Sequence, residues 1–383
     1  MTWARHFVPL RDRQADWAMR CAMVREAERF IYLSTFYLDY DDFGAELLDL
    51  LVAAQARGVR VSLLIDRFGQ RLGGTLMSPS QRADLTRALD ALGRAGGRVT
   101  HYQPPRWLQR RVGGGQHVKI QVSDAGNLIL TSGNLTRTSF SHWREYAVAV
   151  SGAVVPDIMA SWEKIGGMLD PGDGRHLTRL AREMPGDIDM AYGFCNPNLH
   201  QGPFGPWLWQ GTNALTDRMV AMVEAAEREL LISSFYFKPA PVLEEAILRA
   251  ARRGVHVEVH HSHRESLAAT DLAWVAAAVR YPQLLEAGVR IHEHPSGEHS
   301  KICVVDRAWA AFGSYNFEEP AHDRLAEAML VSRDARAVGP ALQVFDELRA
   351  MPDRQEVTTE TVAAWPGQLA KRIRRWGRFR WWL

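Results

Sequence analysis

Cysteine, long hydrophobic runs and an excess of one charge sign are all scarce in this 383-residue chain. The three cysteines, Cys21, Cys195 and Cys303, lie far apart and match no metal-ligand spacing. This pattern disfavours disulfides or a zinc site and indicates a reducing compartment. No apolar stretch approaches the roughly 20 residues that span a bilayer, and residues 1–17 lack the apolar core of a signal peptide. We therefore expect a cytoplasmic protein that is soluble or lies peripherally on the inner membrane face.

The composition is that of an ordinary globular protein. Hydrophobic residues make up 46% of the chain and charged residues 23%, which allows a sizeable core. The formal net charge is only +2, so no global field favours a polyanion, and nucleic acid is an unlikely partner. The length suits two domains or one large pseudo-symmetric domain.

The chain repeats itself. Residues 23–38 (MVREAERFIYLSTFYL) and 222–237 (MVEAAERELLISSFYF) are identical at eight of sixteen positions. Each copy continues with a helical stretch, an Arg-Gly-Val turn and an apolar strand. The alternation predicts an α/β fold with two repeats, each a mixed, mostly parallel sheet flanked by helices, forming a pseudo-twofold sandwich. The predicted segments are a first repeat (1–165), a linker (166–187), a second repeat (188–350) and a basic aromatic tail (351–383).

The first repeat is longer than the second, and its extra residues fall partly in two loop-like stretches, 67–80 and 106–115. The second stretch carries Arg106, Arg110 and Arg111. We interpret this second stretch as a solvated loop. The alternative is a basic lip over an anionic substrate.

Each half carries the same spaced set of polar residues. The pattern is His-x-Lys, four residues, Asp, and then a Ser and an Asn that follow an apolar run, with a Glu eleven residues beyond the Asn. The first copy consists of His117, Lys119, Asp124, Ser132, Asn134 and Glu145, and the second of His299, Lys301, Asp306, Ser314, Asn316 and Glu327.

The spacing indicates one pocket. If His and Lys share a strand, side chains two residues apart face the same way. The apolar run after each Asp resembles the returning strand of a hairpin, which would place Ser and Asn beside them. Gly313 in the second copy allows a close backbone approach.

These residue types suit attack on a phosphodiester. Its negative charge repels nucleophiles, so a site needs cations and hydrogen-bond donors aimed at the non-bridging oxygens. A neutral imidazole is a competent nucleophile, and a second, protonated imidazole can protonate the leaving oxygen. A carboxylate on the other ring nitrogen fixes the tautomer. One half supplies one such histidine, and two halves facing each other supply the pair.

The doubled pattern resembles the phospholipase D superfamily, over most of residues 20–335, and within it is most similar to bacterial cardiolipin synthases. The resemblance implies a two-step transfer through a phosphohistidine, with no metal and no cofactor. By analogy, His117 is the nucleophile and His299 the general acid and base, although the sequence also allows the reverse. The implied phosphate-binding residues are Lys119, Lys301, Asn134, Asn316, Ser132 and Ser314. Glu145 and Glu327 would pair with the histidines, and Asp124 and Asp306 would be structural supports.

The chain departs from the family pattern at two places. Thr131 replaces the motif glycine in the first copy, and Pro320-Ala321 stands where cardiolipin synthases often have Arg-Ser. These departures leave the identity of the donor and acceptor lipids open.

A second group of histidines lies in the second half. His260, His261 and His263 follow a predicted strand, and His292 and His294 alternate on another. A metal site would need supporting ligands, and we found no Cys or acidic residue at a supporting spacing. We therefore expect these histidines to line the polar wall of the cleft.

The last nineteen residues, 365–383, contain six Lys or Arg and five aromatic residues. On a helix, one side carries Leu369, Ile373, Trp376, Phe379 and Leu383, and the other carries Lys371, Arg374 and Arg378. This pattern favours an interfacial anchor for anionic lipid. The alternatives are a helix docked on the protein's own core and contact with a nucleic-acid backbone.

The leading hypothesis is a phosphatidyltransferase of the cardiolipin synthase type that acts on an anionic phospholipid such as phosphatidylglycerol or cardiolipin at the membrane surface. The alternative is a phospholipase D-type hydrolase of phospholipid or nucleic acid. A third, a membrane-binding protein without activity, conflicts with the intact doubled motif. The sequence sets no oligomeric state.

Overall fold

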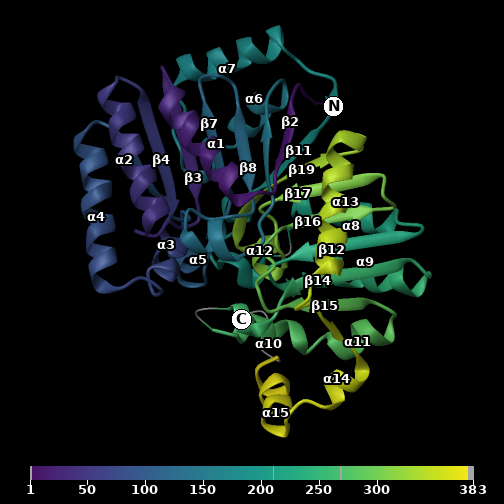
Figure 1. The fold of residues 1–383 in the computed structure, drawn as a ribbon. Coiled ribbons are helices and arrows are strands. Elements are labelled where there is room, and N and C mark those ends of the chain that lie inside the picture. The colour runs from purple at the N-terminus through teal and green to yellow at the C-terminus, as the bar shows by residue number, and fades with distance from the viewer. Residues whose placement is uncertain (1, 210, 268–269, 378–383) are drawn as a thin grey trace.

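The computed structural model describes residues 2–209, 211–267 and 270–377, and its two halves each contain one central sheet (Figure 1). The sheet of the first half has the strand order β2 (Phe7–Leu10), β9 (Ala147–Val150), β8 (Leu128–Thr131), β7 (Ile120–Ser123), β3 (Phe30–Thr35), β4 (Arg60–Asp66) and β5 (Arg98–Tyr102). The sheet of the second half has the order β11 (Ala191–Cys195), β19 (Leu325–Ser332), β17 (Trp309–Gly313), β16 (Ile302–Val305), β12 (Glu229–Ser234), β14 (His256–Ser262), β15 (Arg290–His294) and β20 (Gln355–Val357).

The two sheets share one topology, which confirms the predicted repeat. From β9 to β5 and from β19 to β15, equivalent strands follow in the same order. In each half two neighbouring pairs are parallel, β3–β4 with β4–β5 and β12–β14 with β14–β15. The ladders on the other side of β3 and β12 are antiparallel. The predicted mixed sheet is therefore confirmed, but its strands are not mostly parallel, because each motif forms a hairpin.

Helices cover the outer faces of both sheets. The first half has α1 (Arg13–Glu26), α2 (Asp42–Ala56) and α4 (Pro79–Arg94), and the second has α8 (Ala214–Glu224), α9 (Pro241–Arg252), α10 (Leu272–Ala278) and α11 (Tyr281–Glu286). The Arg-Gly-Val turns follow α2 and α9, where Gly58 and Gly254 have φ of 89° and 90°. This left-handed conformation suits glycine and ends each helix before the next strand.

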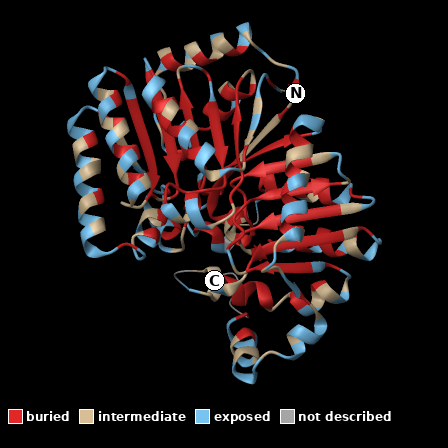
Figure 2. Ribbon diagram, viewed as in Figure 1, coloured by how far each residue is buried: buried red, intermediate tan, exposed pale blue. Residues whose placement is uncertain are grey.

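A shared core joins the halves. It contains residues from both sheets, such as Tyr32 and Leu130 from the first and Ile302 and Phe312 from the second. Helices α6 (Val154–Met159), α7 (Pro171–Glu183) and α13 (Ala335–Ala350) contribute to the same cluster. The strands are buried along almost their whole length (Figure 2). Burial on both faces of a sheet holds the two repeats together as one unit.

The predicted linker, 166–187, is more ordered than expected, because it contains α7. Asp170 caps this helix at its N-terminus, and Asp173 accepts a hydrogen bond of 2.8 Å from Tyr32 Oη in β3. The loop-like stretches also contain helices, α3 (Arg67–Gly73) and α5 (Trp107–Arg111). All three were missed because Gly and Pro obscure their periodicity.

The tail folds back on the second half as α14 (Thr359–Ala363) and α15 (Gly367–Trp376). Ile373 is buried at 3% exposure, and Trp365 and Leu369 pack against the same core. Arg372 pairs with Asp271, 2.7 Å away, beside α10. In the described part of the tail, the helix is therefore docked on the core through Leu369 and Ile373, while Trp376 on the same side is 41% exposed. Phe379 and Leu383 lie outside the described residues, as does Arg378.

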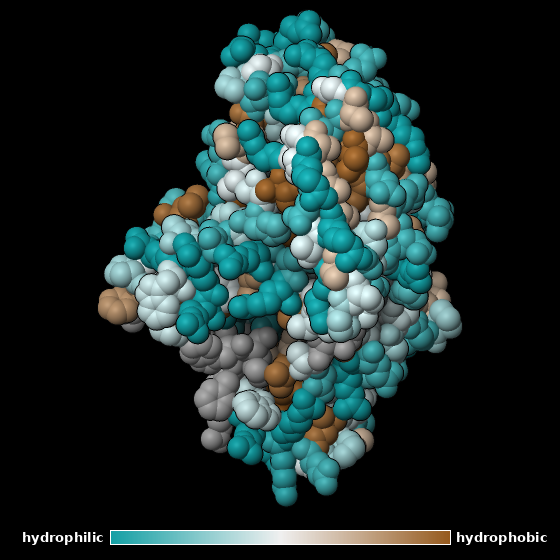
Figure 3. Space-filling view, turned by 90° about the vertical axis from the view of Figure 1, so that its left-hand side faces the viewer, coloured by the Kyte–Doolittle hydropathy of each residue, from teal (hydrophilic) through white to brown (hydrophobic). Residues whose placement is uncertain are grey.

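None of the helices in the described residues combines the length and the apolar character needed to cross a membrane. The three cysteines are buried and free. The surface seen from the left of Figure 1 is largely hydrophilic, with hydrophobic residues scattered over it in small groups (Figure 3).

The motif aspartates lie at the turns of the two hairpins, away from the cleft described below. Asp306 accepts hydrogen bonds from the backbone N–H groups of Glu227, Arg228 and Glu229, at 2.9, 2.8 and 2.8 Å. Asp124 accepts one such bond, from Glu28 at 3.2 Å. These contacts tie each hairpin to the start of β3 or β12, as expected of structural supports.

We predict that Asp306→Ala lowers the free energy of unfolding by about 2 kcal/mol, because three backbone donors lose a charged acceptor. Asp124→Ala is the matched control and should cost about 1 kcal/mol or less, since one long bond is lost. Urea unfolding of both variants measures the difference. Equal losses would show that the three bonds at Asp306 contribute nothing beyond the one at Asp124.

Candidate active site

Each motif histidine enters the site on backbone that pairs with the opposite half. Strand β6 (Gly115–Gln116) pairs in parallel with the start of β19, and His117 N donates to Ala326 O at 2.8 Å. In the second half, Arg144 and Glu298 form the matching parallel bridge, and His299 N donates to Arg144 O at 2.9 Å. The backbone therefore places each histidine beside the glutamate of the other repeat.

The histidine–glutamate pairs cross between the repeats. His117 Nδ1 lies 3.0 Å from Glu327 Oε1, and His299 Nδ1 lies 2.7 Å from Glu145 Oε2. His117 Nδ1 also lies 3.1 Å from the carbonyl oxygen of Ser314. These contacts occupy Nδ1 in both rings and leave Nε2 as the free nitrogen. The predicted histidine–acid partners are thus in contact, and each pair needs both halves of the chain.

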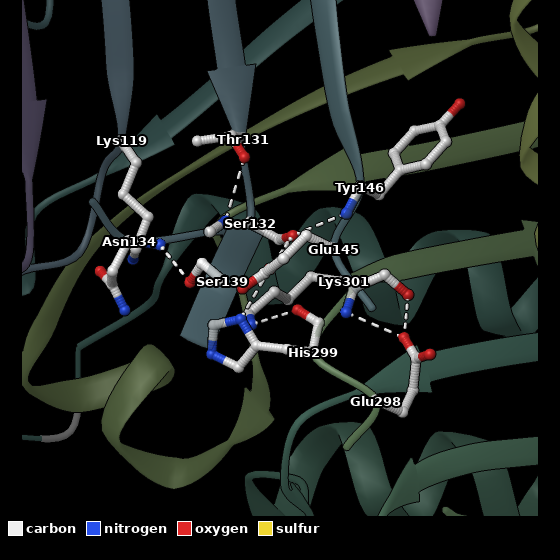
Figure 4. A network of polar contacts seen from close by, with 12 residues as sticks. Lys119, Thr131, Ser132, Asn134, Ser139, Glu145, Tyr146, Glu298, His299 and Lys301 are labelled. Atoms are coloured by element: carbon white, nitrogen blue, oxygen red, sulfur yellow. Dashed lines mark hydrogen bonds and ion pairs between the residues drawn. The ribbon is translucent and has the colours of Figure 1, made fainter. Parts of the chain in front are cut away.

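The two motif serines hold the acids and do not line the cleft. Ser132 Oγ donates to Glu145 Oε2 at 2.6 Å, and Ser314 Oγ donates to Glu327 Oε2. Both serines are fully buried. Figure 4 shows Glu145 between Ser132 and His299. The predicted phosphate-binding role of the serines is therefore wrong, because their hydroxyls are committed to the carboxylates behind the histidines.

The two lysines lie behind the histidines rather than beside them. Lys119 Nζ donates to His117 O at 2.8 Å, and Lys301 Nζ donates to His299 O at 2.5 Å. Both side chains are buried, at 1% and 0% exposure. His117 and Lys119 do not lie on one face of a strand as expected, because β7 begins only at Ile120, after the motif lysine. The lysines supply positive charge from beneath the histidines.

The two imidazoles have different aromatic neighbours. The ring of His299 stacks on Trp143 at 4.9 Å and 29°, and meets the edge of Phe235 at 4.5 Å. The ring of His117 meets Phe36 at 4.8 Å and 83°. The position that matches Trp143 in the second repeat is Leu325, so only His299 lies against an aromatic face. A ring face stabilises a cation, so Trp143 supports the charge of His299 whenever that ring is protonated.

Both histidines line one cleft of about 410 Å³, together with Asn134 and Asn316. The remaining lining is mostly apolar and comes from both halves: Phe36, Tyr37, Phe68, Leu72, Leu76, Val112, Trp143, Phe235, Tyr236, Leu267, Leu272, Ala273, Pro320 and Leu325. Two imidazoles in a cleft with mostly apolar walls would suit a substrate that carries both a phosphodiester and hydrocarbon chains.

Several of these cleft residues were not predicted. The Phe-Tyr pairs at 36–37 and 235–236 are part of the repeated sequence, and that repetition was the signal that could have identified them. Glu318 also lines the cleft and accepts a 2.9 Å hydrogen bond from Asn316 Nδ2. The first repeat has Thr136 at the matching position, so within the described residues only Asn316 of the two motif asparagines has this carboxyl neighbour.

The glutamates of the two histidine–glutamate pairs differ in pKa. Burial raises the pKa of Glu327 to about 8, although Lys119 and Ser314 oppose the shift. Burial also acts on Glu145, but the neighbouring His299, Lys301 and Ser132 lower its pKa to about 2. Glu145 is therefore the carboxylate that can support a protonated histidine. Burial, with Lys119 and Lys301, lowers the pKa of His117 well below its ordinary value, and burial also lowers the pKa of His299 to about 3, with the charge of Glu145 opposing that shift.

The second histidine group lies away from the cleft. Glu258, His260 and His292 are buried, and their ligand-type atoms lie within 4.8 Å of one another. Glu258 is the acidic partner that the sequence reading missed, two residues before His260. Arg349 donates to both Glu258 oxygens, at 2.8 to 3.1 Å, which makes the cluster a charge-satisfied network beneath α13. The expectation that these histidines line the cleft was wrong.

Known proteins share both the sequence pattern and the fold. Residues 21–165 and 219–349 match the family described as cardiolipin synthase, PLD-like domain. Cardiolipin synthase B of Escherichia coli is 26% identical over 329 residues, covering 81% of this chain and 72% of that protein. A cardiolipin synthase of Geobacillus kaustophilus is 26% identical over 313 residues, covering 78% and 57%.

Among solved structures, phosphatidylserine synthase of Haemophilus influenzae superimposes with a TM-score of 0.70 at 16% identity, covering 98% of this chain and 93% of that one. Polyphosphate kinase of Porphyromonas gingivalis superimposes with a TM-score of 0.59 at 11% identity, covering 98% and 53%. These likenesses concern the fold.

We predict that kcat/KM falls by roughly tenfold per pH unit once the pH exceeds about 8. Burial lowers the pKa of Lys301 to about 8, against the opposing charges of Glu145 and Glu327. The ammonium is present below this pH and is lost as the pH rises through it, which removes charge that stabilises the transition state. A pH profile on short-chain phosphatidylglycerol measures the effect. A profile that stays flat to pH 10 would contradict it.

Proposed function

Because the chain belongs to the cardiolipin synthase family of phospholipase D-like domains, and is therefore an enzyme of the phosphatidyltransferase and phosphodiesterase type, we propose that it transfers a phosphatidyl group to a lipid hydroxyl. The observation that carries the proposal is the crossed histidine–glutamate pairing at the base of an apolar cleft. The leading candidate is the transfer between two phosphatidylglycerol molecules that yields cardiolipin and glycerol.

In the first step, the free Nε2 of His117 attacks phosphorus. The bond between phosphorus and the glycerol oxygen breaks, and that oxygen takes a proton from His299. Glu327 and the Ser314 carbonyl orient His117 through its Nδ1, while Lys119 and Lys301 offset the charge that develops on the phosphate oxygens. The product is a phosphatidyl group bound to His117.

In the second step, the hydroxyl of an acceptor lipid gives its proton to His299 and attacks phosphorus. The phosphorus–nitrogen bond breaks, and His117 returns to its neutral form. Glu145 and the face of Trp143 support the charge that His299 carries before the first step and regains in the second. This division of roles follows from the surroundings of the two rings, since only His299 has both an ionised carboxylate and an aromatic face.

The alternative activity is hydrolysis, in which water replaces the acceptor lipid. The decisive experiment incubates the purified protein with phosphatidylglycerol vesicles and identifies products by mass spectrometry. Cardiolipin with glycerol supports the transferase, whereas phosphatidic acid alone would assign the enzyme as a hydrolase. Cleavage of DNA in a parallel reaction, with no lipid product, would overturn the lipid assignment altogether.

We predict that His117→Ala and His299→Ala each reduce turnover by roughly a thousandfold or more, because the two groups act as a unit. The variants should differ in one measurement. With radiolabelled short-chain phosphatidylglycerol and a rapid quench, His299→Ala should still form acyl-chain-bearing labelled protein slowly, and His117→Ala should form none. Labelling of His117→Ala but not of His299→Ala would reverse the two roles.

We further predict that chelation with EDTA leaves turnover on a short-chain substrate within about twofold of the untreated value. The buried lysines and the protonated histidine supply the positive charge that a metal ion supplies in other phosphodiesterases. Complete loss of activity, restored by a divalent ion, would contradict this mechanism.

A further inference from the structure

A second depression lies beside the mouth of the catalytic cleft. It is lined by the arginines of α3 and α5, namely Arg67, Arg71, Arg110 and Arg111, together with Trp107. We refer to these five residues as the arginine groove. Phe68 lines both the groove and the catalytic cleft, so the two hollows adjoin. Figure 1 shows α3 and α5 close together at the lower edge of the first half.

The charge of the arginine groove is not neutralised within the described residues. Residues 67–82 and 98–119 contain no Asp or Glu, and the ion pairs of the described chain include none of the four arginines. Arg67 donates to the side-chain oxygen of Gln103, and Arg110 donates to the carbonyls of Pro104 and Pro105. These neutral acceptors orient the guanidinium groups and leave their positive charge in place.

Exposed apolar side chains border the groove. Leu72 and Leu76, which line the catalytic cleft, are 46% and 47% exposed, and Trp107 is 67% exposed. The short helix η4 (Gly205–Leu208) contacts α5 and adds Trp207, which is 45% exposed. Arginine beside exposed tryptophan and leucine is the combination that binds the interface of an anionic bilayer, where phosphates meet acyl chains.

We propose that the arginine groove docks the enzyme onto a bilayer of anionic phospholipid, with headgroup phosphates against the arginines and Trp107, Leu72 and Leu76 inserted between the lipids. This orientation turns the mouth of the cleft toward the surface that holds the substrate. The proposal depends on the proposed function only in identifying the lipid surface as the source of substrate.

The docking face differs from the one expected from the sequence. Leu369 and Ile373 of α15 pack on the protein's own core, which covers two of the apolar residues expected to face a membrane, although Trp376 is 41% exposed. The arginine groove combines charge that is unpaired within the described residues with several exposed apolar neighbours. It also adjoins the catalytic cleft.

The test is sedimentation of the full-length protein with vesicles of phosphatidylcholine containing phosphatidylglycerol. Arg71→Gln/Arg111→Gln should reduce the partition coefficient by roughly tenfold or more, since each arginine near an anionic surface contributes about fivefold. Arg94→Gln/Arg252→Gln removes the same charge from exposed arginines elsewhere and should bind like the wild type. A thermal melt verifies that both variants are folded.

Trp107→Ala provides a second measurement, because it leaves the charge unchanged. Trp107→Ala should weaken binding to the same vesicles by severalfold and leave the salt dependence of binding unchanged. The double arginine variant should instead make binding less dependent on salt. Wild-type binding by Arg71→Gln/Arg111→Gln would overturn the docking face and assign membrane contact to another part of the chain. Docking through these residues without any lipid product would instead sink the proposed function and leave the docking face standing.

Discussion

The contact on which the site depends is the crossed pair of histidine and glutamate. Neither repeat contains a complete catalytic unit, because the acid that orients each imidazole belongs to the other half. The backbone enforces this exchange, since the residues before each histidine pair in parallel with the strand that carries the opposing glutamate. Separation of the halves would therefore leave both imidazoles without a partner and both carboxylates buried and unpaired, which is costly.

Burial gives these few groups their reactivity. Lys119 and Lys301 lie beneath the histidines, where water does not screen their charge, and each is held by the carbonyl of its own histidine. The same burial lowers the pKa of both His117 and His299, which keeps His117 neutral as its proposed role as the nucleophile requires. The duplicated motif would give two equivalent rings, but Trp143 and the ionised Glu145 distinguish His299. The symmetric fold thus gives its two histidines different surroundings, as the proposed division of roles requires.

The cleft and the surface around it are less symmetric than the core. In chain order α10 and α11 follow β14 as α3 and α4 follow β4, but between β15 and His299 the described residues contain no helix that matches α5. Helices α3 and α5 line the arginine groove, and α3 also adds apolar wall to the cleft. Residues 106–115, which the sequence indicated to be a solvated loop, therefore belong to the part of the structure in which the first repeat differs from the second. The arginines of α3 and α5 line the arginine groove, whereas Leu72 lines the catalytic cleft. Charge counted along the sequence does not show this division.

The sequence by itself determined the repeat and the two motifs, because these follow from spacing and periodicity along the chain, and the resemblance to the phospholipase D superfamily implied the pairing of histidine with acid. It did not determine that the pairs cross, that Ser132 and Ser314 hold the acids, or that α15 packs on the core. Those depend on contacts between residues 13 to more than 200 positions apart. Local periodicity shows that a helix is amphipathic, but only the tertiary structure decides what its apolar face covers.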